Sequence, residues 1–232
     1  MRCGHIVGGR RSDSLPRMGK QNALGAWQTT RRQALDSLVL ARQTIASNHS
    51  GHSKGSVPAE TAGVVENIDR ALYPVLAAEF QGYCRDLHGD AVAAIIAEAQ
   101  WPTEQIARVS AAAMQDKRGL DRKNPASSVI GDDFRALGLK LWNRVQEEHP
   151  EDYPDWRRSL DTLVNIRNAV SHSDRKRLKD FTSKKQLTFA YWQSTRKDLD
   201  LLTIAMDSAV RTYLVEIATP PPHIQQKETD HD

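Results

Sequence analysis

Apolar residues recur at helical spacing along most of the chain, and no strand-like alternation persists for more than a few residues. One stripe consists of Val65, Ile68, Leu72, Leu76, Phe80, Tyr83 and Leu87. A second consists of Leu199, Leu202, Met206, Ala209, Tyr213 and Ile217. Steps of three and four residues are typical of amphipathic helices that turn one side toward a core. The pattern therefore predicts an all-α fold, an up-and-down helical bundle.

Helix-breaking residues divide this bundle into segments. Pro74 lies inside the first stripe and predicts either a kink or a helix start. His88 and Gly89 are typical of a helix end, and Asp90 is suited to cap the helix that follows. We expect further helices over 91–100, 105–116, 132–148 and 192–218, with a basic surface loop over 117–131.

The regions outside the bundle differ from it in composition. A helical stripe that begins at Trp27 precedes a segment rich in Gly, Ser and His, and the chain ends in a polar stretch broken by prolines. The sequence thus predicts a flexible basic leader (1–25), an additional helix (26–47), a linker (48–60), the bundle (61–218) and a disordered tail (219–232).

Positive charge concentrates at the start of the chain. The first 35 residues carry seven Lys and Arg against Asp13 alone, a net charge of +6, so the remaining residues sum to −3 of the total of +3. The overall basicity is therefore no sign that the folded part binds nucleic acid.

Composition excludes several classes of protein. Hydrophobic residues make up 39% of the chain and charged residues 26%, which indicates a globular protein. No apolar run approaches the roughly 18 residues that cross a bilayer, so we expect no membrane partner. Cys3 and Cys84 show no paired spacing, which favours a reducing, cytoplasmic location. His49 and His52 lack further ligands, so we expect no metal and no cofactor.

The stretch SLDTLVNIRNAVSHSD, residues 159–174, carries most of the candidate chemistry. An apolar row (Trp156, Leu160, Leu163, Val170) runs beside a polar row (Asp161, Asn165, Asn168, His172). Asn168 and His172 share a helical face, whereas Arg167 and His172 are about 140° apart on an ideal helix and converge only through the reach of the arginine or a distortion. A fixed guanidinium beside a proton-carrying imidazole suits a phosphodiester, provided that both side chains reach solvent.

A plainer interpretation of the same residues needs no chemistry. Arg167 would be a capping or ion-paired helix residue, and His172 would mark a helix end beside Ser171 and Ser173. Spacing alone favours this interpretation, because single Arg and His residues on helices are common.

The residues IRNAVSHSD resemble the signature of the HEPN superfamily, small all-helical domains whose motif is Arg, four to six residues, then His, often with Asn directly after the Arg. The motif maps here onto Arg167, Asn168 and His172. The helix VENIDRALYPVLAAEFQGYCRDL is similar to the early helix of prokaryotic HEPN families of the RiboL-PSP type, which often bears an acidic or polar residue facing the motif. Glu79 is the first candidate for that residue and Asp86 the second. The resemblance covers roughly 64–218.

This resemblance implies a metal-independent endoribonuclease, commonly a toxin of a toxin–antitoxin or phage-defence system. Such proteins are typically homodimers whose motif helices meet in one cleft, so RNA, a second copy of the chain and an antitoxin protein are candidate partners. His172 would assist attack by a ribose 2′-hydroxyl, Arg167 would stabilise the phosphoryl group, and Asn168 would hold His172 or the substrate. Asp174 stands where one HEPN toxin pattern has a tyrosine, so nucleotidylation there is not expected.

A cationic run directly follows the motif. Its members are Arg175, Lys176, Arg177 and Lys179. Such runs are usually solvated surface, but beside a candidate site they would neutralise an RNA backbone, and we predict RNA contacts here.

Two other classes of function remain open. The first is a non-catalytic HEPN-like domain that binds RNA, nucleotides or a protein. The second is a structural helical adaptor, in which the bundle alone matters and His172 is incidental.

Overall fold

The computed structural model describes residues 22–50 and 59–219, and all regular structure within these ranges is helical. The elements are α1 (Ala23–Ala26), the π-helix η1 (Trp27–Arg31), α2 (Arg32–Ser50), α3 (Ala59–Glu98), α4 (Glu104–Asp116), the 3₁₀ helix η2 (Gly119–Asp121), α5 (Ser127–Ala136), α6 (Leu141–Glu148), α7 (Tyr153–Ser171), α8 (Arg175–Ser183) and α9 (Phe189–Ala218). The predicted all-α bundle is confirmed. The predicted leader and tail, apart from their inner ends, and most of the predicted linker lie outside the described residues.

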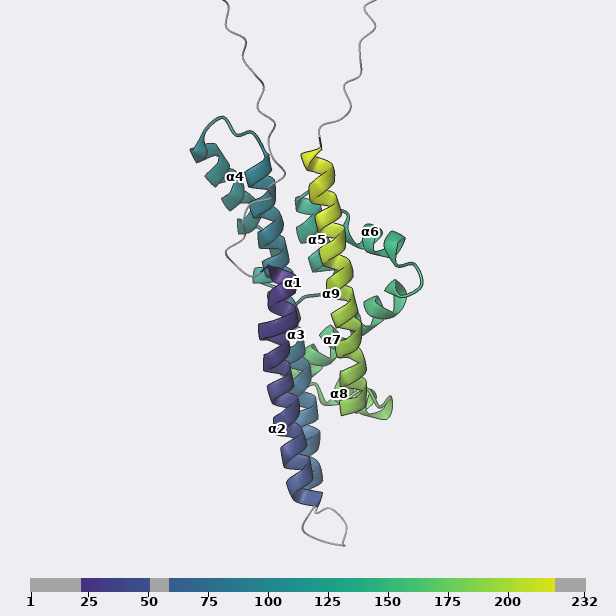
Figure 1. Ribbon diagram of the computed structural model, residues 1–232. Helices are drawn as coiled ribbons and strands as arrows, with labels where there is room; N and C mark the ends of the chain where they lie inside the picture. The colour runs from purple at the N-terminus through teal and green to yellow at the C-terminus, as the bar shows by residue number, and fades with distance from the viewer. Residues whose placement is uncertain (1–21, 51–58, 220–232) are drawn as a thin grey trace, which may run out of the picture.

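Three helices, α3, α7 and α9, pack against one another and hold the core. Figure 1 shows an elongated molecule in which α9 runs beside the long α3. The α3 stripe is buried from Leu72 to Leu87, and the α9 stripe is buried from Leu199 to Ala209. Each Leu, Phe or Met side chain among these contributes roughly 1.5–3 kcal/mol when fully buried. Ile217, at the far end of α9, is 45% exposed, so the predicted stripe extends beyond the core. None of the described helices is both long and apolar enough to cross a bilayer.

The predicted helix end at His88 and Gly89 is wrong, because α3 continues to Glu98. Its apolar stripe also continues, and burial of the next turn outweighs the cost of about 1 kcal/mol for a glycine inside a helix. His88 is a core residue, 1% exposed. The Asp90 carboxylate caps a different helix from the one predicted, since it accepts the Ala23 N–H at 2.9 Å.

The helix expected over 132–148 is two helices, α5 and α6. Gly138, with φ of 87°, occupies the left-handed position of the turn that ends α5. The Leu139 N–H bonds the Phe134 carbonyl at 3.0 Å across this turn. The start of α5 lies inside the predicted basic loop, and α8 is a helix within the charged run after the motif.

The N-terminal helices belong to the same core. Trp27 and Leu35 join the buried cluster, and α1 and α2 lie along α3 (Figure 1). The π-helix ends at Arg31, whose guanidinium lies against Gly82. A Cβ at Gly82 would come 2.2 Å from the Arg31 Nη1, so a larger residue there would displace the guanidinium.

His88 predicts a pH dependence of stability. Burial and the nearby Arg118 lower the pKa of His88, although Asp133 acts in the opposite direction. The unfolded imidazole takes up a proton below about pH 6.5, whereas the folded one stays neutral to lower pH. The free energy of unfolding should therefore be fully developed above about pH 6.5 and fall as the pH decreases from there.

Urea unfolding followed by circular dichroism between about pH 7.5 and 5 would measure this effect. His88→Gln should flatten the pH dependence, and His172→Gln, a change on the exposed surface, should retain it. An equal slope in the wild type and His88→Gln would contradict the assignment.

Candidate functional site

The helix α7 carries the Arg167–Asn168–His172 motif and is held by its apolar face. Trp156, Leu160 and Leu163 are buried, as the sequence predicts. Pro154 lies in the first turn, where its missing N–H costs nothing. Because this face packs against α3 and α9, the polar side of the last turn is turned to the surface.

The last turn of α7 ends in a Schellman motif that fixes the position of α8. Ser173 has φ of 52°, and the N–H groups of Ser173 and Asp174 bond the carbonyls of Val170 and Ala169 at 3.1 and 2.9 Å. The Asp174 carboxylate then caps α8 by accepting the Arg177 N–H at 3.1 Å. Three residues therefore separate the motif helix from the basic helix.

The structure joins two of the three motif residues directly. Asn168 Oδ1 accepts hydrogen bonds from Arg167 Nη1 at 3.3 Å and from Asn124 Nδ2 at 2.5 Å. The His172 side chain is exposed and makes no hydrogen bond to any described residue. The Asn168 oxygen thus orients Arg167, and nothing in the described chain ties this amide to the imidazole.

Both reactive side chains of the motif reach solvent, as a phosphodiester substrate requires. Arg167 is half-buried and His172, the C-cap residue of α7, is exposed. Arg167 forms no ion pair with any described residue, so ion pairing does not explain its place on the helix. The guanidinium is therefore available to a ligand.

The other members of the polar row have separate roles. Asp161 accepts a hydrogen bond from Ser127 Oγ at 2.7 Å and one from Arg157 Nε at 3.3 Å, which ties α5 to α7. Asn165 is exposed. Asp161 therefore supports the scaffold, three turns from His172.

Glu79 and Asp86 face the N-terminal helices. Arg31 Nη1 lies 2.8 Å from Glu79 and Arg31 Nη2 lies 2.7 Å from Asp86. Burial opposes the charge on Arg31, but the hydrogen bonds to both carboxylates outweigh it and raise the pKa of Arg31. No hydrogen bond or ion pair joins either carboxylate to Arg167 or His172 among the described residues.

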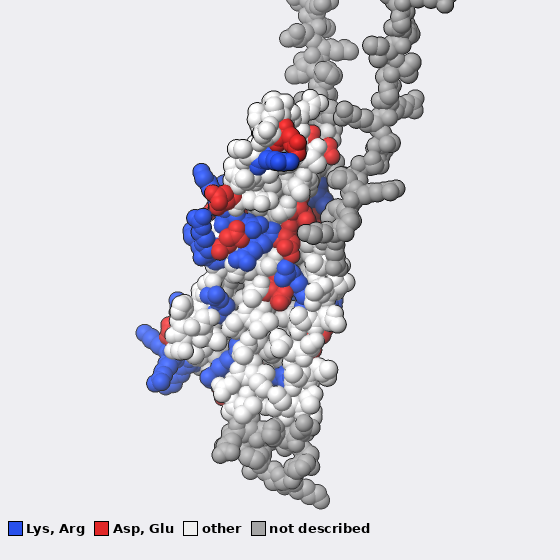
Figure 2. Space-filling model, turned by 90° about the vertical axis from the view of Figure 1, so that its left-hand side faces the viewer, with Lys and Arg blue, Asp and Glu red and all other residues white. Residues whose placement is uncertain are grey.

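Positive charge without a carboxylate partner concentrates around the motif. The described ranges contain 25 Lys and Arg residues, of which 14 form ion pairs, leaving 11 without one. Eight of the 11 are Lys117, Arg122, Lys123, Arg167, Arg175, Lys176, Lys179 and Lys185. The other three are Arg32, Lys140 and Lys197. Figure 2 shows Lys and Arg side chains gathered in two groups on one face of the molecule.

The predicted RNA-contact residues all lie on α8. Arg175 and Lys179 line a shallow groove of about 520 Å³ between α8 and α3, together with Arg70 and the hydroxyl residues Thr182 and Ser183. Lys176 and Arg177 are exposed, and Arg177 lies 3.9 Å from Asp174. Such a groove presents cations and hydroxyl donors, the groups that bind phosphate.

Sequence reasoning missed Asn124, which contacts the motif from a loop 44 residues earlier. The dipeptide Asn124–Pro125 was the available signal, because a residue before proline favours an extended backbone and marks a fixed turn. In the described part of the chain, no group of three or more His, Cys, Asp or Glu residues is placed to hold a metal ion.

Ser173 predicts a stabilising substitution beside the motif. A side chain at positive φ costs about 1 kcal/mol, so Ser173→Gly should raise the free energy of unfolding by about 0.5–1 kcal/mol. Ser194→Gly, the same change at an exposed position inside α9, should lower it by about 0.5 kcal/mol. Urea unfolding measures both, and destabilisation by Ser173→Gly would contradict the strained turn.

Comparisons with known proteins give no identification. No family model matches the chain, and no curated protein and no solved structure matches it significantly. The candidate site is therefore defined by the motif, its fixed helix end and the unpaired cations around it.

Proposed function

We propose that the chain is a HEPN-like, metal-independent endoribonuclease, a toxin or phage-defence component. The observation that supports this most is the distribution of unpaired charge. In the described part of the chain, eight of the 11 Lys and Arg residues without a carboxylate partner belong to the motif, to α8 and its end, or to the loop held by Asn124. A polyanion such as RNA is the substrate that uses a fixed guanidinium flanked by cations.

The residues divide the reaction between them. Arg167 stabilises charge on the phosphoryl oxygens, and Asn168 positions its guanidinium. An imidazole takes the proton of the ribose 2′-hydroxyl, whose oxygen attacks the adjacent phosphorus, and the 5′-oxygen leaves with a proton from a second acid. The products are a 2′,3′-cyclic phosphate and a 5′-hydroxyl. A two-fold dimer supplies His172 twice, once as base and once as acid.

A specific observation favours a second function, RNA binding without cleavage. The His172 side chain has no hydrogen-bond partner in the described chain, whereas catalytic imidazoles are usually oriented by a second group. In that case the motif serves as a phosphate-binding turn. The two functions share the RNA surface and differ in turnover.

The nuclease proposal predicts cleavage of RNA in the presence of a chelator. His172→Ala should lower the cleavage rate by about 10²–10⁴-fold, because it removes the proton carrier while leaving the exposed helix end intact. Arg167→Ala should lower the rate by about 10²–10³-fold. Gel analysis of end-labelled RNA measures the rate and identifies the cyclic phosphate.

Arg158→Ala is the matched control, since Arg158 is an exposed arginine on the same helix. It should cleave like the wild type. RNA that binds but stays intact with the wild type would favour the second function, and cleavage that persists in His172→Ala would exclude His172 as the proton carrier.

The two-histidine mechanism also predicts a homodimer. Sedimentation equilibrium should give twice the mass of one chain, and the cleavage rate should fall with the square of protein concentration once the dimer dissociates. A monomer that cleaves with a rate proportional to its concentration would rule out the shared cleft.

A further inference from the structure

We infer that the loop over 117–124, which joins α4 to α5, is a second binding element for the RNA backbone, with Lys117, Arg122 and Lys123 as its phosphate contacts. The inference rests on the proposed RNA-binding function and adds a surface separate from α8. Four features of the loop support it: a fixed backbone, free cations, a direct link to the motif, and the lack of aromatic side chains.

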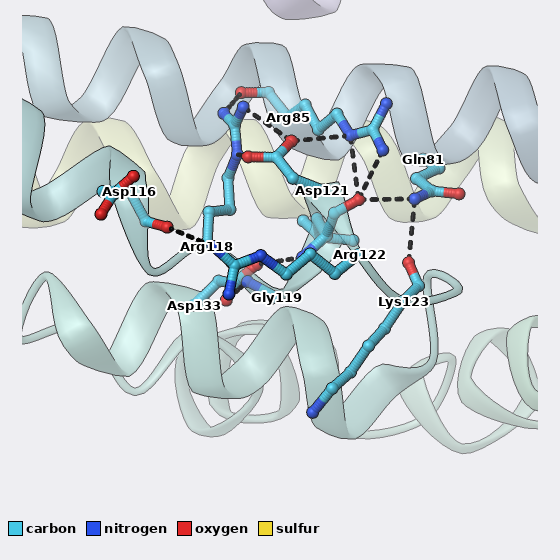
Figure 3. Close-up of polar contacts among 10 residues, drawn as sticks. Gln81, Arg85, Asp116, Arg118, Gly119, Asp121, Arg122, Lys123 and Asp133 are labelled. Atoms are coloured by element: carbon cyan, nitrogen blue, oxygen red, sulfur yellow. Dashed lines mark hydrogen bonds and ion pairs between the residues drawn. The ribbon is translucent and has the colours of Figure 1, made fainter.

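The backbone of the loop is held on two sides. From α5, Asp133 accepts the N–H groups of Gly119 and Leu120 at 2.7 and 2.9 Å. From α3, Gln81 Nε2 donates to the carbonyls of Leu120 and Lys123 at 2.6 and 2.9 Å. Figure 3 shows these contacts converging on the loop from both helices. The Leu120 side chain is fully buried, so the loop cannot shift without opening the core.

The Lys and Arg side chains of the loop fall into two groups, those that form an ion pair within the protein and those that do not. Arg118 donates to both carboxylate oxygens of Asp121 at 2.9 Å and to the Arg85 carbonyl at 3.0 Å. These bonds hold the pKa of Asp121 below its ordinary value. The charge of Asp121 is thereby balanced by Arg118, so the carboxylate attracts the neighbouring lysines only weakly.

Three cations are left over for a ligand. The side chains of Lys117 and Lys123 make no hydrogen bond and no ion pair with any described residue, and Figure 3 shows the Lys123 side chain extending away from the network. The Arg122 side chain donates one long hydrogen bond, 3.4 Å, to the Asp116 carbonyl. All three residues are exposed. With Arg118 and Asp121 included, the segment has a net charge of +3.

The loop is attached directly to the motif. Asn124 follows Lys123 in sequence, and its side chain donates to the Asn168 oxygen that also accepts from Arg167. An RNA phosphate bound at Lys123 would therefore lie one residue from Asn124, which contacts the Asn168 oxygen that orients Arg167. The other three unpaired cations, Arg32, Lys140 and Lys197, are not next in sequence to a described residue that hydrogen-bonds the motif.

The chemistry of the loop selects the backbone of RNA and ignores its bases. Residues 117–124 include no aromatic side chain on which a base could stack. Contacts limited to phosphates release counterions on binding, so affinity falls with salt, with a slope of about 0.7 per contact on a single strand. Binding at the loop is thus independent of base sequence and sensitive to salt.

The test compares two triple variants that remove the same charge. One is Lys117→Gln with Arg122→Gln and Lys123→Gln, and the other is Arg32→Gln with Lys140→Gln and Lys197→Gln. Both are made in the His172→Ala background so that RNA stays intact. Fluorescence anisotropy with a labelled single-stranded RNA, at several salt concentrations, gives the affinity and its salt slope.

The loop triple should weaken binding by about tenfold or more and reduce the salt slope by about 2, because three phosphate contacts are lost. The control triple should change both much less. Equal effects of the two triples would overturn the inference while leaving RNA binding intact. Failure of the His172→Ala parent and the wild type to bind RNA at all would overturn the proposed function as well. Matching thermal unfolding of the two triples shows that neither change acts through the fold.

Discussion

A buried carboxylate, Asp133, determines how the loop and the helices around it fit together. A carboxylate at 6% exposure is costly unless hydrogen bonds replace its water, and here two backbone N–H groups of the loop do so. Gly119 favours this close approach, since a Cβ there would lie 3.0 Å from Val129 and 3.2 Å from the Asp133 carboxylate and would push both neighbours outward. The loop therefore has one position between α3 and α5, and from that position Asn124 reaches α7.

Local sequence was sufficient for the elements whose apolar stripe is long. The burial of Leu160 and Leu163 in α7 and of Leu199 and Leu202 in α9 followed from spacing alone. In an amphipathic helix, the apolar residues that recur with the helical period form the face that packs on the core. Helix ends were less predictable. At His88 and Asp90 the deciding partners are Phe134 and Ala23, which are distant in sequence, so tertiary contacts overrode the local glycine signal.

The candidate site shows the same contrast between what local spacing predicts and what distant contacts decide. Spacing placed Arg167, Asn168 and His172 at one end of one helix. The sequence also showed a cationic run directly after the motif, but it did not show that this run forms the helix α8. The plainer interpretation placed a helix end at His172, and the structure agrees, because α7 ends at Ser171 and His172 is its C-cap. Spacing could not show that Glu79 and Asp86 contact Arg31, 48 and 55 residues away, since the π-helix that delivers Arg31 has no pattern in the sequence.

The Asn124–Pro125 step bears on the thermodynamics of any ligand that binds beside it. Proline restricts the preceding residue to extended conformations, and the hydrogen bonds to Gln81 and Asp133 have already removed the remaining backbone freedom. Little conformational entropy is then left to lose on complex formation, and favourable electrostatic free energy is not offset by ordering of the protein. A short segment with few charges and a fixed backbone can thus contribute as much to the binding affinity as a longer, flexible basic tail.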